Sequence, residues 1–152
     1  MRRKIENPAD TPVEVYHWWH DRWCEYLNSN YKDKFVETGL AGLTCTERSP
    51  DAPDGSGGLS YTFAADGSVR FIPTDDNADA ICEYDSYELG IRCLGDPNTN
   101  AGEHIKAGRF RIVKSPEVFT RMIPIQPLMR EAFRIAIEDA EIEFDIELPK
   151  YG

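Results

Sequence analysis

The sequence predicts a single α+β domain in which helices pack against one face of an antiparallel sheet. Three observations indicate this class. A segment with helical spacing opens the chain, short β-branched and aromatic segments follow, and a second amphipathic segment precedes a final alternating one. The length of 152 residues, of which 41% are hydrophobic, suits one core of ordinary size. We therefore expect one domain over residues 1–152.

The N-terminal amphipathic helix is predicted from Pro12 to about Asn28. Thr11 can cap this helix, Pro12 suits its first position, and Glu14 completes a capping box. The apolar residues recur at steps of three and four and so share one face, which comprises Val15, Tyr16, Trp19, Trp23, Tyr26 and Leu27. The polar segment 32–37 is expected to connect the helix to the sheet.

A meander of antiparallel strands is predicted between residues 43 and 114. Its best-defined pair joins 59–64 to 68–74 through a three-residue loop that ends at Gly67. With Gly67 in the left-handed region, this loop sets Phe63 opposite Val69.

The rest of the meander is predicted from short apolar runs between turn-forming residues. Further strands are expected at 80–84, 87–94 and 104–114. Two segments rich in glycine, proline, aspartate and asparagine, 49–58 and 95–102, are expected to be exposed loops.

The C-terminal part is predicted to be a helix followed by a final strand. Pro127 can open the helix, whose apolar face runs from Leu128 to Ile137. From Ala140 to Leu148 apolar residues alternate with carboxylates, which is typical of a strand. Continuation of the helix is the alternative, because glutamate and alanine favour helices, but it would scatter the large apolar side chains around the cylinder.

The formal net charge of −10 argues against a protein that holds phosphate backbones, so we expect no direct binding of nucleic acid. No apolar run is long enough to cross a membrane, and the first residues lack the apolar stretch of a secretory signal. These observations predict a chain made in the cytoplasm with no membrane partner.

The four cysteines are Cys24, Cys45, Cys82 and Cys93, and no two of them form a C-x-x-C pair. Their spacing matches neither a zinc ribbon nor a redox motif. We expect four reduced thiols that pack as small hydrophobic side chains.

Candidate catalytic and metal-binding motifs are weak. His17, His20 and Cys24 share one stripe of the first helix, so they could meet a zinc ion, but the chain supplies no second spaced pair of ligands. The histidines are expected instead at the margin of the aromatic face. No nucleophile elbow and no phosphate loop occurs, so the sequence predicts neither an enzyme, a metal nor a cofactor.

Charge is unevenly distributed, because a basic segment, 104–135, lies between acidic ones. If the last strand exposes its carboxylates in a row, two arginines of the basic strand are their natural complement. The candidate binding residues are Arg109, Arg111, Glu141, Glu143, Asp145 and Glu147. The rows could join copies of the chain, mimic the phosphates of a nucleic acid, or simply form internal ion pairs and a solvated face.

The functional prediction from these patterns is a non-enzymatic structural subunit of a multi-copy assembly. The best candidate is a small bacteriophage virion protein of the neck, tail or shell, which would act through contacts with copies of itself or with other subunits. It would be made in the cytoplasm and carried in the virion. The alternative is an acidic inhibitor or immunity-type protein that mimics nucleic acid and blocks a nucleic-acid-processing enzyme.

Overall fold

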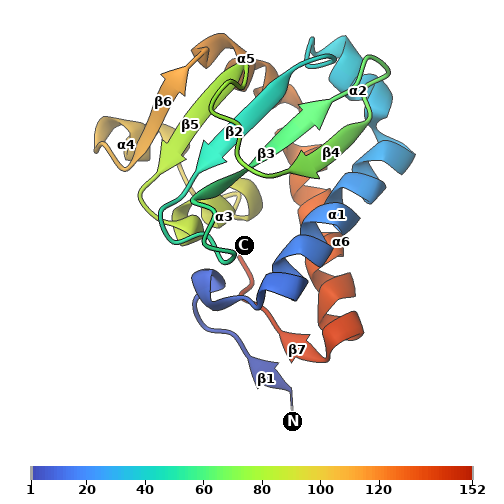
Figure 1. The fold of residues 1–152 in the computed structure, drawn as a ribbon, viewed down its shortest axis with the longest axis vertical. Coiled ribbons are helices and arrows are strands. Elements are labelled where there is room, and N and C mark those ends of the chain that lie inside the picture. The colour runs from blue at the N-terminus through green and yellow to red at the C-terminus, as the bar shows by residue number, and fades with distance from the viewer. Residues whose placement is uncertain (1, 152) are drawn as a thin grey trace.

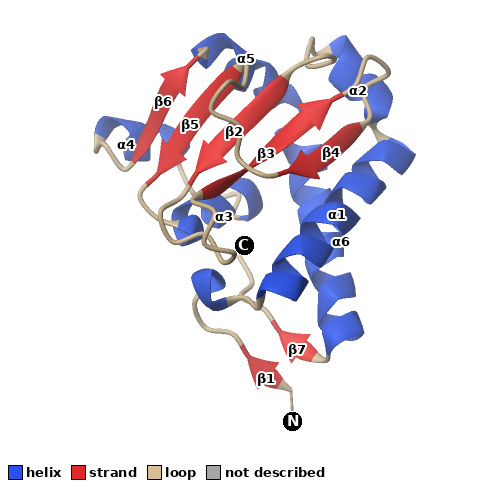
Figure 2. Ribbon diagram, viewed as in Figure 1, coloured by secondary structure: helices blue, strands red, loops and turns tan. Residues whose placement is uncertain are grey.

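The structure, a computed structural model, describes residues 2–151 and consists of a five-stranded sheet with the two long helices on one of its faces (Figure 1). A small two-stranded sheet lies apart from the main one (Figure 2). The predicted α+β class is confirmed, as is the order of an N-terminal helix, a sheet, a C-terminal helix and a final strand.

The helices are α1 (Val13–Asn30), α2 (Lys32–Glu37), α3 (Tyr87–Gly95), α4 (Ala101–Lys106), α5 (Pro116–Met122) and α6 (Gln126–Phe144), with short 3-10 helices η1 (Pro8–Asp10) and η2 (Ile123–Ile125). The strands are β1 (Arg3–Lys4), β2 (Thr44–Arg48), β3 (Gly58–Phe63), β4 (Val69–Ile72), β5 (Ala80–Tyr84), β6 (Phe110–Lys114) and β7 (Ile146–Glu147).

The main sheet has the strand order β4-β3-β2-β5-β6. The predicted hairpin of β3 and β4 is confirmed, with Phe63 opposite Val69 and Gly67 at a φ of +88°. One pair differs from the expected antiparallel meander, because β2 and β5 run parallel with Cys45 beside Ala80. The segment between β4 and β5 crosses β3 and β2, where Asp75 contacts Thr46 and Ser60. The strand β5 therefore pairs with β2 and not with β4.

The two faces of the sheet differ in polarity because apolar and polar residues alternate along its strands. On β3, Tyr61 and Phe63 point to the helices and are buried. Between them Thr62 points to the open face, where its hydroxyl accepts a hydrogen bond from that of Thr44 at 3.0 Å. The covered face therefore supplies one wall of the interior.

The helices α1 and α6 lie side by side against the covered face of the sheet (Figure 1). Trp19 packs edge-on against Phe133, with ring centroids 5.3 Å apart. Trp23 is 1% exposed, and its indole N–H donates a hydrogen bond of 3.0 Å to the carbonyl of Met129. The aromatic face predicted for the first helix is thus part of the core.

The prediction of a strand over 87–94 is wrong, because these residues form α3. Their alternation of apolar and polar residues fits a strand, but the local cap favours a helix. Ser86 is the N-cap, and its hydroxyl accepts a 3.1 Å hydrogen bond from the amide of Leu89. As a helix, the segment buries Tyr87 and Ile91 on one side and Cys93 on another.

The predicted strand over 104–114 and the loop over 95–102 are corrected in the same way. Asn100 caps α4, and only the residues from Phe110 onward form strand β6. The loop is therefore reduced to 96–100, between α3 and α4. The segment 49–58 forms turns between β2 and β3, as expected, although Ser49 and Gly58 at its ends are buried.

The prediction of a strand from Ala140 is also wrong, because α6 continues to Phe144. Ala136 and Ala140 are fully buried where α6 meets α1, and that packing needs the helical spacing of four. Asp145, with a φ of +51°, ends the helix, and the final strand β7 has two residues that pair in parallel with β1. Similarly, the polar connection expected at 32–37 is helix α2, anchored by the buried Phe35.

Candidate functional site, an apolar cavity under the sheet

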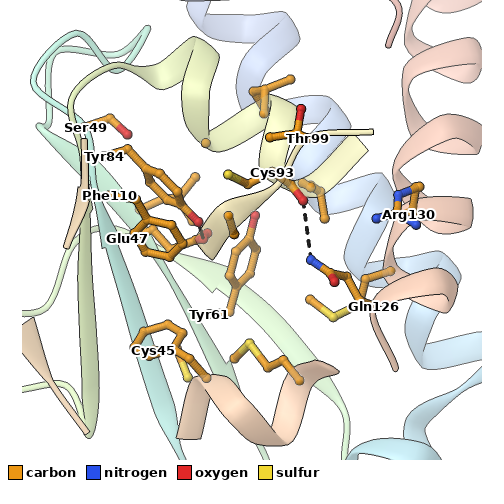
Figure 3. A pocket seen from close by; sticks show the side chains of 18 of the residues that line it. Cys45, Glu47, Ser49, Tyr61, Tyr84, Cys93, Thr99, Phe110, Gln126 and Arg130 are labelled. Carbon is orange, nitrogen blue, oxygen red and sulfur yellow. Dashed lines mark hydrogen bonds between the residues drawn. The ribbon is translucent and has the colours of Figure 1, made fainter. Parts of the chain in front are cut away.

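A cavity of about 780 Å³ lies between the covered face of the sheet and the helices (Figure 3). The sheet contributes side chains from β2, β3, β5 and β6, and the opposite walls come from α1, α3, α5 and α6. Aromatic and aliphatic side chains dominate the lining, among them Trp23, Tyr61, Phe63, Tyr84, Ile91, Leu94, Phe110 and Met129. Such a volume and lining are typical of sites for small apolar or amphipathic molecules.

The cavity has a closed end and an open end. At the closed end Tyr16, Trp23 and Cys45 are at most 1% exposed. At the open end the lining residues come from the loop 96–100, α4, α5 and η2, and Ile105 and Ile123 are 44% and 64% exposed. A molecule would therefore enter between α4 and η2, past two exposed isoleucines.

The sequence of β2 leaves room at the centre of the cavity. Cys45 and Glu47 face the helices, while Thr46 and Arg48 point to the opposite face. Cysteine is too small to fill the space beneath the sheet. Burial raises the pKa of the Cys45 thiol to about 12 and that of Cys93, across the cavity on α3, to about 11. Both thiols therefore line the cavity as neutral groups.

Glu47 is the acidic side chain in the lining. Its Oε1 accepts a hydrogen bond of 3.2 Å from the hydroxyl of Tyr84 (Figure 3), and Oε2 accepts none from the residues that the structure describes. Although part of the side chain is accessible, that part faces the cavity, and the carboxyl group is enclosed by protein. Burial raises the pKa of Glu47 because the charged form loses its hydration.

Tyrosines surround this carboxyl group. Burial raises the pKa of Tyr16, Tyr61 and Tyr87, and the nearby charge of Glu47 adds to this rise, although at Tyr16 the charge of Asp54 contributes more. The Tyr16 and Tyr87 rings meet edge to face at 5.6 Å. Tyr16 is fully buried, and its hydroxyl finds no hydrogen-bond partner among residues 2–151.

The wall formed by α6 is polar near its start. The side-chain amide of Gln126 donates a 3.4 Å hydrogen bond to the carbonyl of Cys93, and Arg130 also lines the cavity (Figure 3). Within the described residues, Arg130 Nε is buried without a hydrogen-bond partner. The cavity thus combines an apolar body with a few polar groups on separate walls.

The stripe of His17, His20 and Cys24 has separate contacts. His17 pairs with Asp54 at 3.0 Å, while Nδ1 of His20 lies 2.7 Å from the carbonyl oxygen of Tyr16. The His20 ring is buried and stacks on Trp19 with centroids 3.5 Å apart. The prediction that the histidines lie at the margin of the aromatic face is wrong for His20, which is buried in the core. All four cysteines are free and buried, which confirms their predicted packing.

The two predicted arginines lie on or beside β6 and contact this chain. Arg111 pairs with Glu83 at 3.3 Å and with Asp85 at 2.8 Å on the open face of the sheet. Arg109 Nε donates to Nδ1 of His104 at 2.9 Å. Of the alternatives left open by the sequence, internal ion pairing is therefore the one that the structure shows for Arg111.

The four predicted carboxylates do not form a row. Glu141 is buried on α6, where it accepts a 2.9 Å hydrogen bond from the amide of Leu148 and pairs with Lys150. Glu143 is exposed on α6, Asp145 pairs with Arg2 at 3.2 Å, and Glu147 lies in β7. A helix turns successive carboxylates to different sides, and so the spacing expected of a strand is lost. Binding of a partner by these six residues stays a prediction.

Sequence reasoning missed Glu47 and the cavity around it. One signal was present, because Glu47 alternates with Thr46 and Arg48 in a strand, so that a carboxylate shares the inward side with Cys45. The enclosing tyrosines come from four other elements, and no local pattern links them.

The fold and cavity define a class of protein, an α+β domain that encloses an internal apolar site. No family model and no curated protein sequence matches the chain. Among solved structures, it resembles the sterol carrier protein domain 2 of Helicoverpa armigera, with a TM-score of 0.53, 13% identity, and coverage of 82% of this chain and 93% of that one. It also resembles UbiJ-SCP2, described as a ubiquinone synthesis protein, with a TM-score of 0.52, 15% identity, and coverage of 70% and 87%. At these identities the likeness shows the fold.

These findings overturn the functional prediction made from charge. Neither the bacteriophage virion subunit nor the nucleic-acid-mimicking inhibitor is supported, because the two solved structures named above, which resemble the chain, are a sterol carrier protein domain and a ubiquinone synthesis protein. The inhibitor prediction also depended on the row of carboxylates, which the helical course of residues 140–144 removes. The uneven distribution of charge was a weak guide because some of the charges pair within the chain, as those of Arg48 and Arg111 do.

Within residues 2–151, no helix is long and apolar enough to cross a membrane.

Proposed function

We propose that the protein binds one small apolar or amphipathic molecule in the cavity under the sheet and acts as its carrier. The observation that carries this proposal is the cavity itself, about 780 Å³ in volume, lined mainly by aromatic and aliphatic side chains, and open at one end. The names of the solved structures with the same fold, which refer to sterol carriage and to ubiquinone synthesis, favour a lipid as the ligand.

A carrier needs no chemical step, and we propose that the protein is not an enzyme. The polar groups of the cavity support this, because the thiols and tyrosines of its wall have raised pKa values and are poor nucleophiles at neutral pH. The four free thiols also favour the predicted cytoplasmic setting.

The test of this proposal uses the full chain and Nile red, a neutral apolar dye that fluoresces in apolar surroundings. Leu94→Trp enlarges a side chain of the cavity wall on α3. Leu43→Trp is the matched control, since Leu43 is similarly half-buried against the core but does not line the cavity. We expect L94W to weaken dye binding by about tenfold, or about 1.4 kcal/mol, and L43W to leave it unchanged.

Extraction of native protein with organic solvent should also release a lipid, which mass spectrometry would identify. The same lipid should be recovered chemically unaltered after incubation with the protein. Equal dye binding by L94W and wild type would show that the dye binds elsewhere. Failure of wild type to bind the dye or any extracted lipid would refute the carrier proposal.

A further inference from the structure

The buried carboxyl group of Glu47 is unusual in a cavity built for apolar ligands. An ionised carboxylate away from water is strongly destabilising unless a cation or several hydrogen bonds compensate it. Here compensation is partial, because Tyr84 donates the one hydrogen bond that the structure records for this carboxylate. The strand neighbour Arg48 points to the other face, where it pairs with Glu83 at 3.0 Å and Asp76 at 3.2 Å.

No basic side chain of residues 2–151 forms an ion pair with Glu47. The basic side chains that share the cavity are Arg130, which extends from α6 on the opposite wall (Figure 3), and His20 of α1, which is neutral because burial lowers its pKa to about 3. The raised pKa of Glu47 has the same origin, since burial without a cation favours the neutral acid. A cation brought by the ligand would supply the missing charge.

The groups around Glu47 suit such a cation. The faces of tyrosine rings attract positive charge, and Tyr16, Tyr61, Tyr84 and Tyr87 all lie close enough to Glu47 for its charge to raise their pKa values. Tyr16 adds an independent observation. It is 0% exposed, it lines the cavity, and its hydroxyl has no hydrogen-bond partner in the described chain. That oxygen can accept a hydrogen bond from a ligand.

We propose that Glu47 and the Tyr16 hydroxyl form a subsite for a protonated amine at one end of an otherwise apolar ligand. This inference rests on the proposed carrier function and specifies the ligand class. A primary ammonium carries three N–H donors, of which we expect one to donate to Glu47 Oε2 and another to the Tyr16 hydroxyl. A neutral hydroxyl could make the same hydrogen bonds but would leave the carboxylate charge uncompensated.

The closed position of the subsite sets the orientation of the ligand. Tyr16 belongs to the buried end of the cavity, while the entrance lies at Ile105 and Ile123. The amine therefore enters first, and the apolar chain fills the space toward α4 and η2. The net charge of −10 favours the approach of a cation.

The experiment compares dodecylamine with dodecanol, which share one alkyl chain and differ in the charged end. Aliphatic amines, like the lysine side chain with a pKa of about 10.4, are protonated at neutral pH. Each compound displaces Nile red from the full chain. We expect wild type to bind the amine at least about tenfold more tightly than the alcohol, which corresponds to about 1.4 kcal/mol.

Glu47→Gln removes the charge and keeps the shape, and it should abolish the preference for dodecylamine over dodecanol. Glu103→Gln is the matched control, because it makes the same change of net charge on the exposed surface of α4 beside the entrance. Tyr16→Phe should weaken amine binding several-fold, and it provides a second test if E47Q does not fold.

The outcomes separate this inference from the proposal on which it rests. If wild type binds Nile red but takes up the amine and the alcohol equally, the ammonium subsite is refuted and the carrier function stands. An amine preference that E47Q and Y16F both retain also refutes the subsite. If wild type binds neither the dye nor the two compounds, the carrier function itself fails.

Discussion

At the scale of single residues, two titratable side chains lie in the interior with opposite effects on stability. Burial raises the pKa of Glu47 and lowers that of His20 to about 3, so each favours its neutral form. For Glu47, the stabilisation of the folded state is complete below the ordinary carboxyl pKa and is lost as the pH rises through the raised value. For His20 the pH dependence is opposite, because the neutral ring stabilises the folded state at neutral pH and this stabilisation is lost as the pH falls.

The prediction for His20 concerns mildly acidic conditions. The unfolded chain binds a proton at this residue below about pH 6.5, whereas the folded chain does not until about pH 3. The free energy of unfolding should therefore decrease as the pH falls from 6.5 toward 3, and by about 2 kcal/mol from this residue alone at pH 5.

His20→Phe keeps a ring between Trp19 and Phe71 and removes the titration. Urea denaturation at pH 7.5 and pH 5 should show a smaller loss of stability in H20F than in wild type. The same loss in both proteins would mean that His20 is protonated in the folded state at pH 5, in contradiction to its burial.

At the scale of elements, turns and caps decided where the chain changes direction. The hairpin of β3 and β4 closes at Gly67 beneath α2, and a Cβ atom there would lie 2.0 Å from the carbonyl oxygen of Lys32. Gly55, in the turns between β2 and β3, also has a positive φ, +72°, but has open space around it. A substitution at Gly55 therefore tests backbone strain alone, whereas one at Gly67 adds a steric clash with α2.

Gly67→Ala should lower the free energy of unfolding by about 2 to 4 kcal/mol, because α2 has to move away from the hairpin. Gly55→Ala should cost about 1 kcal/mol, which is the strain of a left-handed alanine alone. Thermal unfolding of the two variants measures the difference. Equal losses would show that α2 does not approach the hairpin so closely.

A second prediction at this scale concerns α4 and η2, which form the entrance of the cavity. Ile105 on α4 and Ile123 on η2 are exposed where a ligand would pass, while Ile142 on α6 is 73% exposed outside the cavity. Charged side chains at the entrance should oppose the passage of an apolar molecule. We expect Ile105→Asp and Ile123→Asp each to slow Nile red association several-fold in stopped-flow fluorescence without changing the melting temperature.

Ile142→Asp is the control and should bind the dye at the rate of wild type. If I142D slows association as much as the entrance variants do, the effect comes from net charge and not from the path between α4 and η2.

At the scale of the whole molecule, the cavity links ligand binding to stability. A ligand that binds the folded chain and not the unfolded chain stabilises the fold by mass action. At a concentration of 100 times its Kd, an apolar ligand should raise the free energy of unfolding by about 2.7 kcal/mol. Differential scanning fluorimetry with the lipid extracted from native protein should therefore show a rise of roughly 5 to 10 °C in melting temperature.

The Leu94→Trp variant should show a smaller rise at the same ligand concentration, because its cavity is partly filled. A rise of equal size in L94W would place the ligand outside the cavity.

The sequence by itself determined the elements whose signals are local. The aromatic face of α1, the hairpin at Gly67, the four buried thiols and the α+β class follow from spacing, from turn chemistry and from the absence of paired cysteines. The expectation of one domain over residues 1–152 stays a prediction. Each local signal succeeded because the residues that decide the structure are neighbours along the chain.

Only the tertiary structure decided between helix and strand where apolar and polar residues alternate. The Ser86 cap favours a helix at α3, but the packing of α3 against α6, and of the end of α6 against α1, decided against the period of two. The same holds for the cavity and for Glu47. The tyrosines around this carboxyl group come from α1, β3, β5 and α3, and the parallel pairing of β2 with β5 places Tyr84 beside it. Contacts between residues far apart in the chain depend on the whole fold, and therefore the site could not be read from the sequence.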